Sequence, residues 1–314
     1  MKLKCTKDVA ISSLALLLIL LVILAVIAMI LIAPIRSVEV DEERRALYME
    51  GLSVLELSLK CDVGRVMVDF SDEGEELVLM KVQGEVRQSL FSMGDPVQIS
   101  WDAYVIDSRL RIEARVGLNA FSTSLGMNGL DVKISISPSL LADLTVEHTV
   151  GEIQLQADES CSLSHVRLIG KTGSVAANLA PGTKLLGDLS IQTTTGNARL
   201  YWDEVDVQGQ VNVSVRTTTG SISISVIQTQ PYSGSVLMQG SATTGRVDME
   251  MSIQPPISSR ISSSVSTGSI EIASSQGFVG GDALLSSANY PSPQRMDVFL
   301  STNTGSIRLD LVYS

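Results

Sequence analysis

The sequence predicts an all-β fold, a β-solenoid of roughly 23-residue units that follows one N-terminal transmembrane α-helix. Three observations support this prediction. An uncharged run lies near the N-terminus, a Thr-Gly pair recurs through the C-terminal half, and apolar residues alternate with polar ones around each pair. The composition agrees with short β-branched strands and tight turns, because aromatic residues make up only 4% of the chain.

The uncharged run extends from Val9 to Ala33 and reads "VAISSLALLLILLVILAVIAMILIA". At about 1.5 Å per helical residue it is long enough to cross a hydrocarbon layer of ~30 Å. It is longer than the apolar region of a cleaved signal peptide, and Pro34 follows it directly. We therefore expect a retained single-pass anchor.

The charges that flank this run predict its orientation. Lys2, Lys4 and Lys7 precede it, and a basic flank stays in the cytoplasm. Residues 1–8 are then a cytoplasmic tail and residues 34–53 a juxtamembrane linker. This predicts a protein of the cell membrane whose β region is extracytoplasmic.

The chain beyond the anchor is acidic. It carries 20 basic and 33 acidic residues, a net charge of −13. Such a surface repels nucleic acid and anionic headgroups. We therefore expect no nucleic-acid partner.

Residues 54–140 are predicted to form an irregular, capping β region. The stretch "VLELSLKCDVGRVMVDFS" places alternating apolar residues on both sides of Gly64, and the rest shows strand patterns without regular spacing. Terminal units of a solenoid are atypical, which favours a cap. A separate small β domain is the alternative.

Residues 141–314 contain the repeat. Apolar residues occupy the second and fourth positions after each of seven marker glycines and alternate with polar ones, as in Ile222, Ser223 and Ile224. This period of two predicts strands with one buried face. Six of the glycines follow Thr and one follows Val: Gly151, Gly173, Gly196, Gly220, Gly245, Gly268 and Gly305.

A single unit cannot bury its own apolar face, whereas units stacked ~4.8 Å apart share one core. In this interpretation the stretch "TTTG", Thr217 to Gly220, is a corner whose threonines form hydrogen-bonding or methyl-packing ladders with neighbouring units. It does not resemble a phosphate-binding loop, which needs Gly-Lys-Ser/Thr at the start of a helix. A hairpin with Thr-Gly as its loop is the alternative.

The last unit is interrupted at residues 276–295. The stretch "QGFVGGDALLSSANYPSPQ" is rich in Gly, Ser, Asn and Pro. It predicts an inserted loop or hairpin that protrudes from the stack.

The sequence lacks the usual residues of nucleophilic or zinc-dependent hydrolysis. No Gly-x-Ser-x-Gly, His-Glu-x-x-His or paired Cys-x-x-Cys occurs. Of the two histidines, His148 lies where other units place Thr193 or Thr217 and is assigned to a corner, and His165 is expected to face solvent. We predict no catalytic, cofactor-binding or metal-binding residues.

Two acidic stretches could offer oxygen ligands to calcium, "SDEGEE" at Ser71 to Glu76 and "YWDEVD" at Tyr201 to Asp206. Solvated turns are the favoured interpretation of both. The single Gly280-Gly281-Asp282 does not make a calcium-binding repeat. No pair of carboxylates stands out as that of a glycosidase.

Two questions stay open. Cys61 and Cys161 lie in the predicted exterior, where a disulfide could persist, but the sequence does not bring their Cα atoms within the ~5.5 Å that a bridge needs. Asn212 begins the sequon "NVS" and is expected to point outward. Whether it carries a glycan is undecided.

Recurring Thr-Thr-Gly-Ser-Ile-x-Ile units, introduced by "VKISISPSLLADLTVEHTVGEIQLQ", resemble the bacterial and archaeal "putative adhesin" families, whose domains form head-like β-helices. The resemblance covers residues 130–314 and, more loosely, 54–70. It implies an envelope-exposed module with no catalytic residues to carry over. The Val150-Gly151 unit and the insertion after Gly268 depart from the family pattern.

The predicted function is an adhesin-like structural or binding module of the cell envelope, without catalysis. An envelope polysaccharide or a surface protein is the expected partner. One alternative is a filament subunit, because the N-terminal run is similar to the hydrophobic helix of archaeal type IV pilins, although Lys7-Asp8-Val9 does not fit their processing site. The other is a β-helical polysaccharide-active enzyme.

Overall fold

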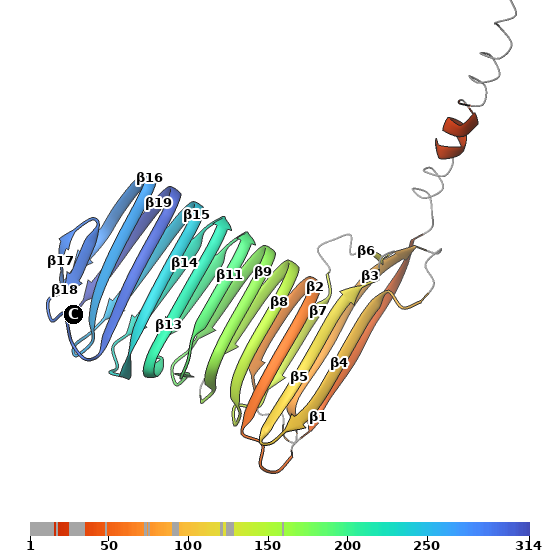
Figure 1. Ribbon diagram of the computed structural model, residues 1–314, viewed down its shortest axis with the longest axis horizontal. Helices are drawn as coiled ribbons and strands as arrows, with labels where there is room; N and C mark the ends of the chain where they lie inside the picture. The colour runs from red at the N-terminus through yellow and green to blue at the C-terminus, as the bar shows by residue number, and fades with distance from the viewer. Residues whose placement is uncertain are drawn as a thin grey trace, which may run out of the picture.

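The computed structural model describes residues 16, 18–24, 35–47, 49–71, 74, 76–89, 94–119, 122–123, 129–158 and 160–314. From residue 35 onward the described chain is all β (Figure 1). Its strands are β1 (Ile35–Leu47), β2 (Val54–Phe70), β3 (Glu76–Ser89), β4 (Val97–Ile106), β5 (Arg109–Leu118), β6 (Ser122–Thr123), β7 (Asp131–Ile136), β8 (Leu141–Ala157), β9 (Ser162–Leu179), β10 (Lys184–Leu185), β11 (Leu189–Thr195), β12 (Ala198–Asp203), β13 (Asp206–Thr219), β14 (Ile222–Gln228), β15 (Ser233–Ile253), β16 (Ser258–Gln276), β17 (Phe278–Gly281), β18 (Leu284–Ser287) and β19 (Arg295–Tyr313).

Most of these strands form layers that lie side by side and pair in parallel (Figure 1). Each layer has two arms that meet at a corner glycine. In spatial order the layers are β2, β8, β9, β11 with β12, β13 with β14, β15, β19 and β16. Because neighbouring layers pair in parallel, the hairpin alternative for these units is excluded.

The corner glycines stand in register, so that Gly64 pairs with Gly151 and Gly245 with Gly305. At Gly220 the φ angle is 141°, and a Cβ atom would lie 1.9 Å from the carbonyl oxygen of Gly196 in the next layer. A residue with a side chain satisfies neither condition. The glycine therefore allows both the turn and the close approach of the layers.

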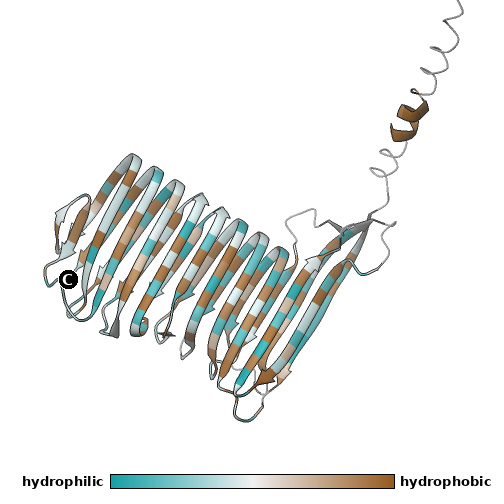
Figure 2. Ribbon diagram, viewed as in Figure 1, coloured by the Kyte–Doolittle hydropathy of each residue, from teal (hydrophilic) through white to brown (hydrophobic). Residues whose placement is uncertain are grey.

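The core fills the space between the two sets of arms. Residues at the second and fourth positions after the corner glycine are at most 1% exposed in every layer from β2 to β19, as Ile222 and Ile224 illustrate. Figure 2 shows the resulting alternation of hydrophobic and hydrophilic residues along the strands. In β16 the equivalent Ile270 and Ile272 are only partly buried, because β16 is the outermost layer.

Chain order and spatial order differ at the C-terminal end. Strand β19 lies between β15 and β16, so the last strand of the chain is an inner layer. The stretch 276–295 contains the hairpin of β17 and β18, and β18 pairs antiparallel with Arg260–Ser262 on the first arm of β16. The hairpin thus covers one arm of the outermost layer.

At the N-terminal end the two arms of β2 continue into different strands. The first arm pairs with β5, which pairs antiparallel with β4. The second arm pairs with β7, and β3 and then β1 add to it in antiparallel pairing. Strand β1 occupies most of the region that the sequence assigns to a juxtamembrane linker.

The predicted transmembrane helix is wrong. Of the run Val9–Ala33 the structure describes only residues 16 and 18–24, which are helical, and the remainder lies outside the described residues. Among the described residues no helix has the length and apolar character needed to span a membrane. The predicted localisation in the cell membrane depends on that helix, so it is not supported either.

The predicted solenoid also needs correction, because six strands close a parallel barrel. Strand β9 pairs with both β11 and β12, these pair with β13 and β14, and β15 pairs with both of the latter. The circuit closes because β9 and β15 run unbroken through their corners, whereas the chain is interrupted at Gly196 and Gly220. The fold is all-β, with this closed barrel within the stack.

Candidate functional site

A groove of about 1230 Å³ lies at the N-terminal end of the stack, over the corners of the first layers. Five glycines are among the residues that line it. At Gly151 and Gly173 an added Cβ would lie within 2 Å of the carbonyl oxygen of the corner glycine in the neighbouring layer, so these positions require glycine. The glycines that line it are Gly64, Gly84, Gly129, Gly151 and Gly173.

Polar side chains line the groove because of strand register. Across the sheet, Asp41 of β1 pairs with Gln83 of β3, and Gln83 pairs with Asp131 of β7. The row continues from Asp131 to Arg65 of β2 and then to Glu152 of β8. These residues alternate with buried ones along their strands, so all five point to the outer face.

Most of the charge in the groove is negative. Five carboxylates line it, Glu39, Asp41, Glu85, Asp131 and Glu152, against the single cation Arg65. Arg65 Nε lies 3.2 Å from Glu152 Oε2, and Gln83 Nε2 donates to Asp41 Oδ1 over 3.1 Å. The groove therefore carries uncompensated negative charge.

Two of the carboxylates face each other directly. Glu39 on β1 and Glu85 on β3 are register partners in the antiparallel pair. Among the residues that the structure describes, neither one, nor Asp131, forms a hydrogen bond or an ion pair through its side chain. Like charges directly opposite each other on a sheet are destabilising. This arrangement would be relieved by a cationic ligand.

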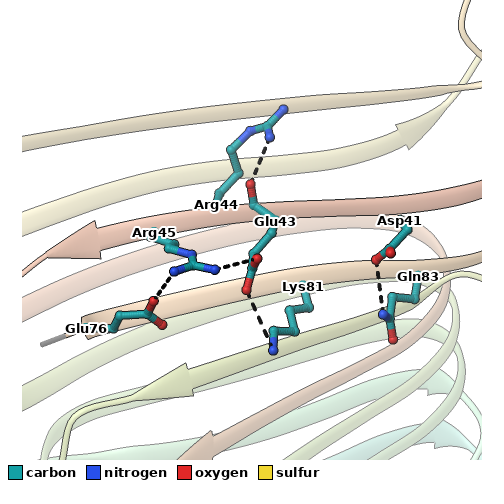
Figure 3. A network of polar contacts seen from close by, with 7 residues as sticks. All are labelled: Asp41, Glu43, Arg44, Arg45, Glu76, Lys81 and Gln83. Carbon is teal, nitrogen blue, oxygen red and sulfur yellow. Dashed lines mark hydrogen bonds and ion pairs between the residues drawn. The ribbon is translucent and has the colours of Figure 1, made fainter. Parts of the chain in front are cut away.

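The rim of the groove is held by a charge network on β1 and β3 (Figure 3). Glu43 accepts a hydrogen bond from Arg45 over 2.7 Å and lies 3.6 Å from Lys81 Nζ, while Arg45 also reaches Glu76 over 2.6 Å. This hydrogen bond, which Arg45 donates, lowers the pKa of Glu43 and raises the pKa of Arg45. In this network beside the groove, Glu43, Arg45, Lys81 and Glu76 are thus paired.

The groove offers little to metal or hydrolytic chemistry. Within the described ranges, no group of three His, Cys, Asp or Glu side chains could hold a metal ion. A glycosidase needs one carboxyl group in a drier environment than its partner, whereas Glu39 and Glu85 are both exposed. Attraction of a cation is what the arrangement supports.

The corner threonines form the predicted hydrogen-bonding ladder. The hydroxyl of Thr193 donates to the carbonyl oxygen of Gly173 over 3.2 Å, and that of Thr217 to Gly196 over 3.1 Å. Thr302 repeats the contact with Gly245. These side chains are buried, so their role is to join layers.

His148 takes the same position in the Gly151 layer. It is 3% exposed, and its Nε2 has no hydrogen-bond partner. Burial lowers the pKa of His148 to about 4, against a smaller opposing effect of Asp62. His165 is exposed, with Nδ1 3.7 Å from Asp143 Oδ2. The structure does not bring the two histidines together.

The open cysteine question is settled, because Cys61 and Cys161 are free and buried. Burial raises the pKa of Cys61 to about 12 and that of Cys161 to about 11. Both thiols are therefore protonated and unreactive in the folded protein.

We expect neither thiol to react with Ellman's reagent in the native protein at pH 8. Both should react after denaturation in guanidinium chloride, because unfolding restores access and the ordinary thiol pKa. The measurement is the absorbance of released thionitrobenzoate. A Cys5→Ser variant removes the third cysteine of the chain, and its reaction within minutes under native conditions would contradict the burial of Cys61 and Cys161.

In the described part of the two acidic stretches, Glu204 and Glu76 are engaged in contacts within the fold. Glu204 turns its carboxylate to the backbone N–H groups of Thr229 and Gln230, over 3.0 and 2.8 Å, and so fastens a loop. In the stretch 71–76, Glu76 pairs with Arg45, and residues 72, 73 and 75 lie outside the described part of the chain. Asp282 follows the hairpin strand β17 and is exposed.

Asn212 is engaged within the sheet. Its Nδ2 donates to Asp188 Oδ1 over 3.0 Å, and the same oxygen accepts from its backbone N–H. The outward direction of the side chain agrees with the sequence. Its amide is held by the neighbouring layer.

Sequence reasoning missed the groove. Its residues on β1 fall in the predicted linker, although "SVEVDEE" alternates Val38 and Val40 with Glu39 and Asp41. That period of two was the signal for a strand with a charged outer face. The convergence of β1, β3 and β7 on the corner of β2 depends on antiparallel pairing that no repeat encodes.

Comparison with known protein families and with curated proteins finds no match. Three solved structures resemble the chain at low identity. A "putative cell adhesion protein" from Clostridium sporogenes is 16% identical over 87% of this chain and 100% of its own, with a TM-score of 0.40. A "putative adhesin" from Bacteroides fragilis is 10% identical over 87% of this chain and 97% of its own, with a TM-score of 0.32. Another from Parabacteroides distasonis is 10% identical over 88% and 98%, with a TM-score of 0.22. These names agree with the resemblance to adhesins that the sequence predicts.

Proposed function

We propose that the protein is an adhesin-like binding module that holds a positively charged partner segment in its N-terminal groove and performs no catalysis. The observation that supports this is the groove itself, which is lined by five carboxylates, one arginine and five glycines. A protein of net charge −11 attracts cations in general. The groove concentrates that attraction at one place.

The directly opposed pair Glu39 and Glu85 supports a binding role more than a structural one. The pairing costs the free protein stability, on the order of 0.5 kcal/mol for like charges at opposite positions. A lysine or arginine side chain between the two carboxylates would turn this repulsion into two attractions. Ligand binding is then the state in which the arrangement is favourable.

The test is isothermal titration of the full chain with hexalysine at low and at physiological salt. We expect binding that weakens with salt, because exposed charges are screened. Glu85→Gln should weaken binding about fivefold and raise the free energy of unfolding slightly. If Glu85 served only the fold, its replacement would lower the free energy of unfolding.

Glu271→Gln is the matched control, an exposed carboxylate on β16 at the far end of the stack. If both variants weaken hexalysine binding equally, the effect is one of net charge and the groove is not the site. Absence of binding by the wild-type chain at low salt would reject the proposal.

A further inference from the structure

We infer that Tyr201 and Arg199, on the outer face of the second arms, form a separate binding site for a neutral polysaccharide chain. This inference goes beyond the proposed function, because it uses a different surface and a different class of ligand.

Register places both side chains among small neighbours. On β12, Tyr201 pairs with Asn178 of β9 and Ser225 of β14. Arg199 pairs with Ala176 and Ser223 on the same strands. The two large side chains therefore stand above their flanks, and the faces of the tyrosine ring are not covered by the adjacent strands.

Neither side chain is used by the fold. Tyr201 is 45% exposed, and among the described residues neither its hydroxyl nor the Arg199 guanidinium forms a hydrogen bond or an ion pair. Other exposed tyrosines differ. Tyr104 lies under Arg111, 5.9 Å from the guanidinium carbon, and donates to Glu113 over 3.3 Å.

These two groups suit a sugar chain. An exposed aromatic ring offers a flat apolar surface with a polar edge, which matches the C–H face and the hydroxyl rim of a pyranose. Arg199 adds fixed hydrogen-bond donors two residues away on the same face, and Asn178 and Ser225 add further polar groups beside the ring. A chain that lies along the strand would contact ring and guanidinium together.

Charge selects a neutral ligand. The protein has a net charge of −11, and Glu250 follows Ser225 in the same cross-strand row as Tyr201. An anionic polymer would be repelled by this carboxylate and by the protein as a whole. A cationic peptide would meet Arg199 at the centre of the site. A polymer of hydroxyl groups meets neither obstacle.

The test is affinity gel electrophoresis of the full chain in gels that contain laminarin, dextran, galactomannan or polygalacturonate. We expect at least one neutral polymer to retard the wild-type protein and polygalacturonate not to. Tyr201→Ala should weaken that retardation about tenfold, because ring stacking is lost, while Tyr201→Phe should retain most of it. Arg199→Ala should weaken it by a smaller factor.

Two controls separate this site from general effects. Tyr104→Ala removes an exposed tyrosine from the other face, and Arg308→Ala removes an arginine that pairs in register with Asp248 and Glu271; both should leave retardation unchanged. The inference would be overturned if polygalacturonate alone, or no polymer at all, retarded the wild-type protein. Equal retardation of the wild type and Tyr201→Ala would also overturn it. Hexalysine binding by Tyr201→Ala should equal that of the wild type, so failure of this site and failure of the groove are distinguishable.

Discussion

Gly220→Ala is expected to destabilise the stack strongly. The φ angle of Gly220 is 141°, and an added Cβ would lie 1.9 Å from the carbonyl oxygen and 2.7 Å from the carbonyl carbon of Gly196. Both partners are backbone atoms, so relief would require layers to separate and their parallel hydrogen bonds to break. We expect the free energy of unfolding to fall by more than ~4 kcal/mol, a loss of the size that backbone strain and overpacking of a core can cause.

Urea denaturation followed by circular dichroism measures this effect. Gly209→Ala is the matched control, because Gly209 also has a positive φ, 82°, but an added Cβ would meet nothing within 4 Å. Gly209→Ala should lower the free energy of unfolding by only about 1 kcal/mol, which is the cost of the backbone conformation alone. Equal midpoints for the two variants would show that contact between corner glycines does not hold the layers together.

The corner glycines show how much of the fold the sequence predicts. A corner glycine can be recognised because aliphatic residues recur at fixed distances from it, and burial of Ile222 and Ile224 follows from that spacing. No such signal predicts that β19 lies between β15 and β16. Both strands carry the same Thr-Gly motif, so the sequence allows either to be the outer layer.

The candidate sites were less accessible to sequence reasoning. Glu39 and Glu85 lie 46 residues apart in the sequence and meet through antiparallel pairing of β1 with β3, which no periodic pattern specifies. Tyr201 belongs to "YWDEVD", a stretch in which the carboxylates, and not the tyrosine, suggest a site from the sequence alone. Its importance lies in the small residues of the neighbouring layers, which become adjacent only in the stack.

The N-terminal run shows an opposite limit. Its uncharged length predicts a transmembrane helix on hydropathy alone, but no helix among the described residues has the length and apolar character to span a membrane. Hydropathy measures what a segment could do if it were one continuous helix.

Acid should destabilise the protein through His148 between pH 6.5 and 4. In the unfolded chain its pKa is near 6.5, whereas burial lowers the folded value to about 4. Between these values the unfolded state binds a proton that the folded state does not, so stability falls as pH falls. The slope approaches about 1.4 kcal/mol per pH unit, and the total loss is on the order of 3 kcal/mol.

The measurement is the free energy of unfolding of wild type and His148→Thr at several pH values from 7.5 to 3.5. Threonine is the informative replacement, because Thr193 at the equivalent corner donates to the carbonyl oxygen of Gly173 over 3.2 Å. The difference between the two proteins should favour the variant by an additional ~3 kcal/mol at pH 4 relative to pH 7, and stay constant below pH 4. His165→Gln, at an exposed position, should follow the wild type. If the free energy of unfolding of the wild type and of His148→Thr changed with pH in parallel, the imidazole would bind its proton equally well in the folded state. That result would contradict the lowered pKa of the buried His148, whose Nε2 has no hydrogen-bond partner.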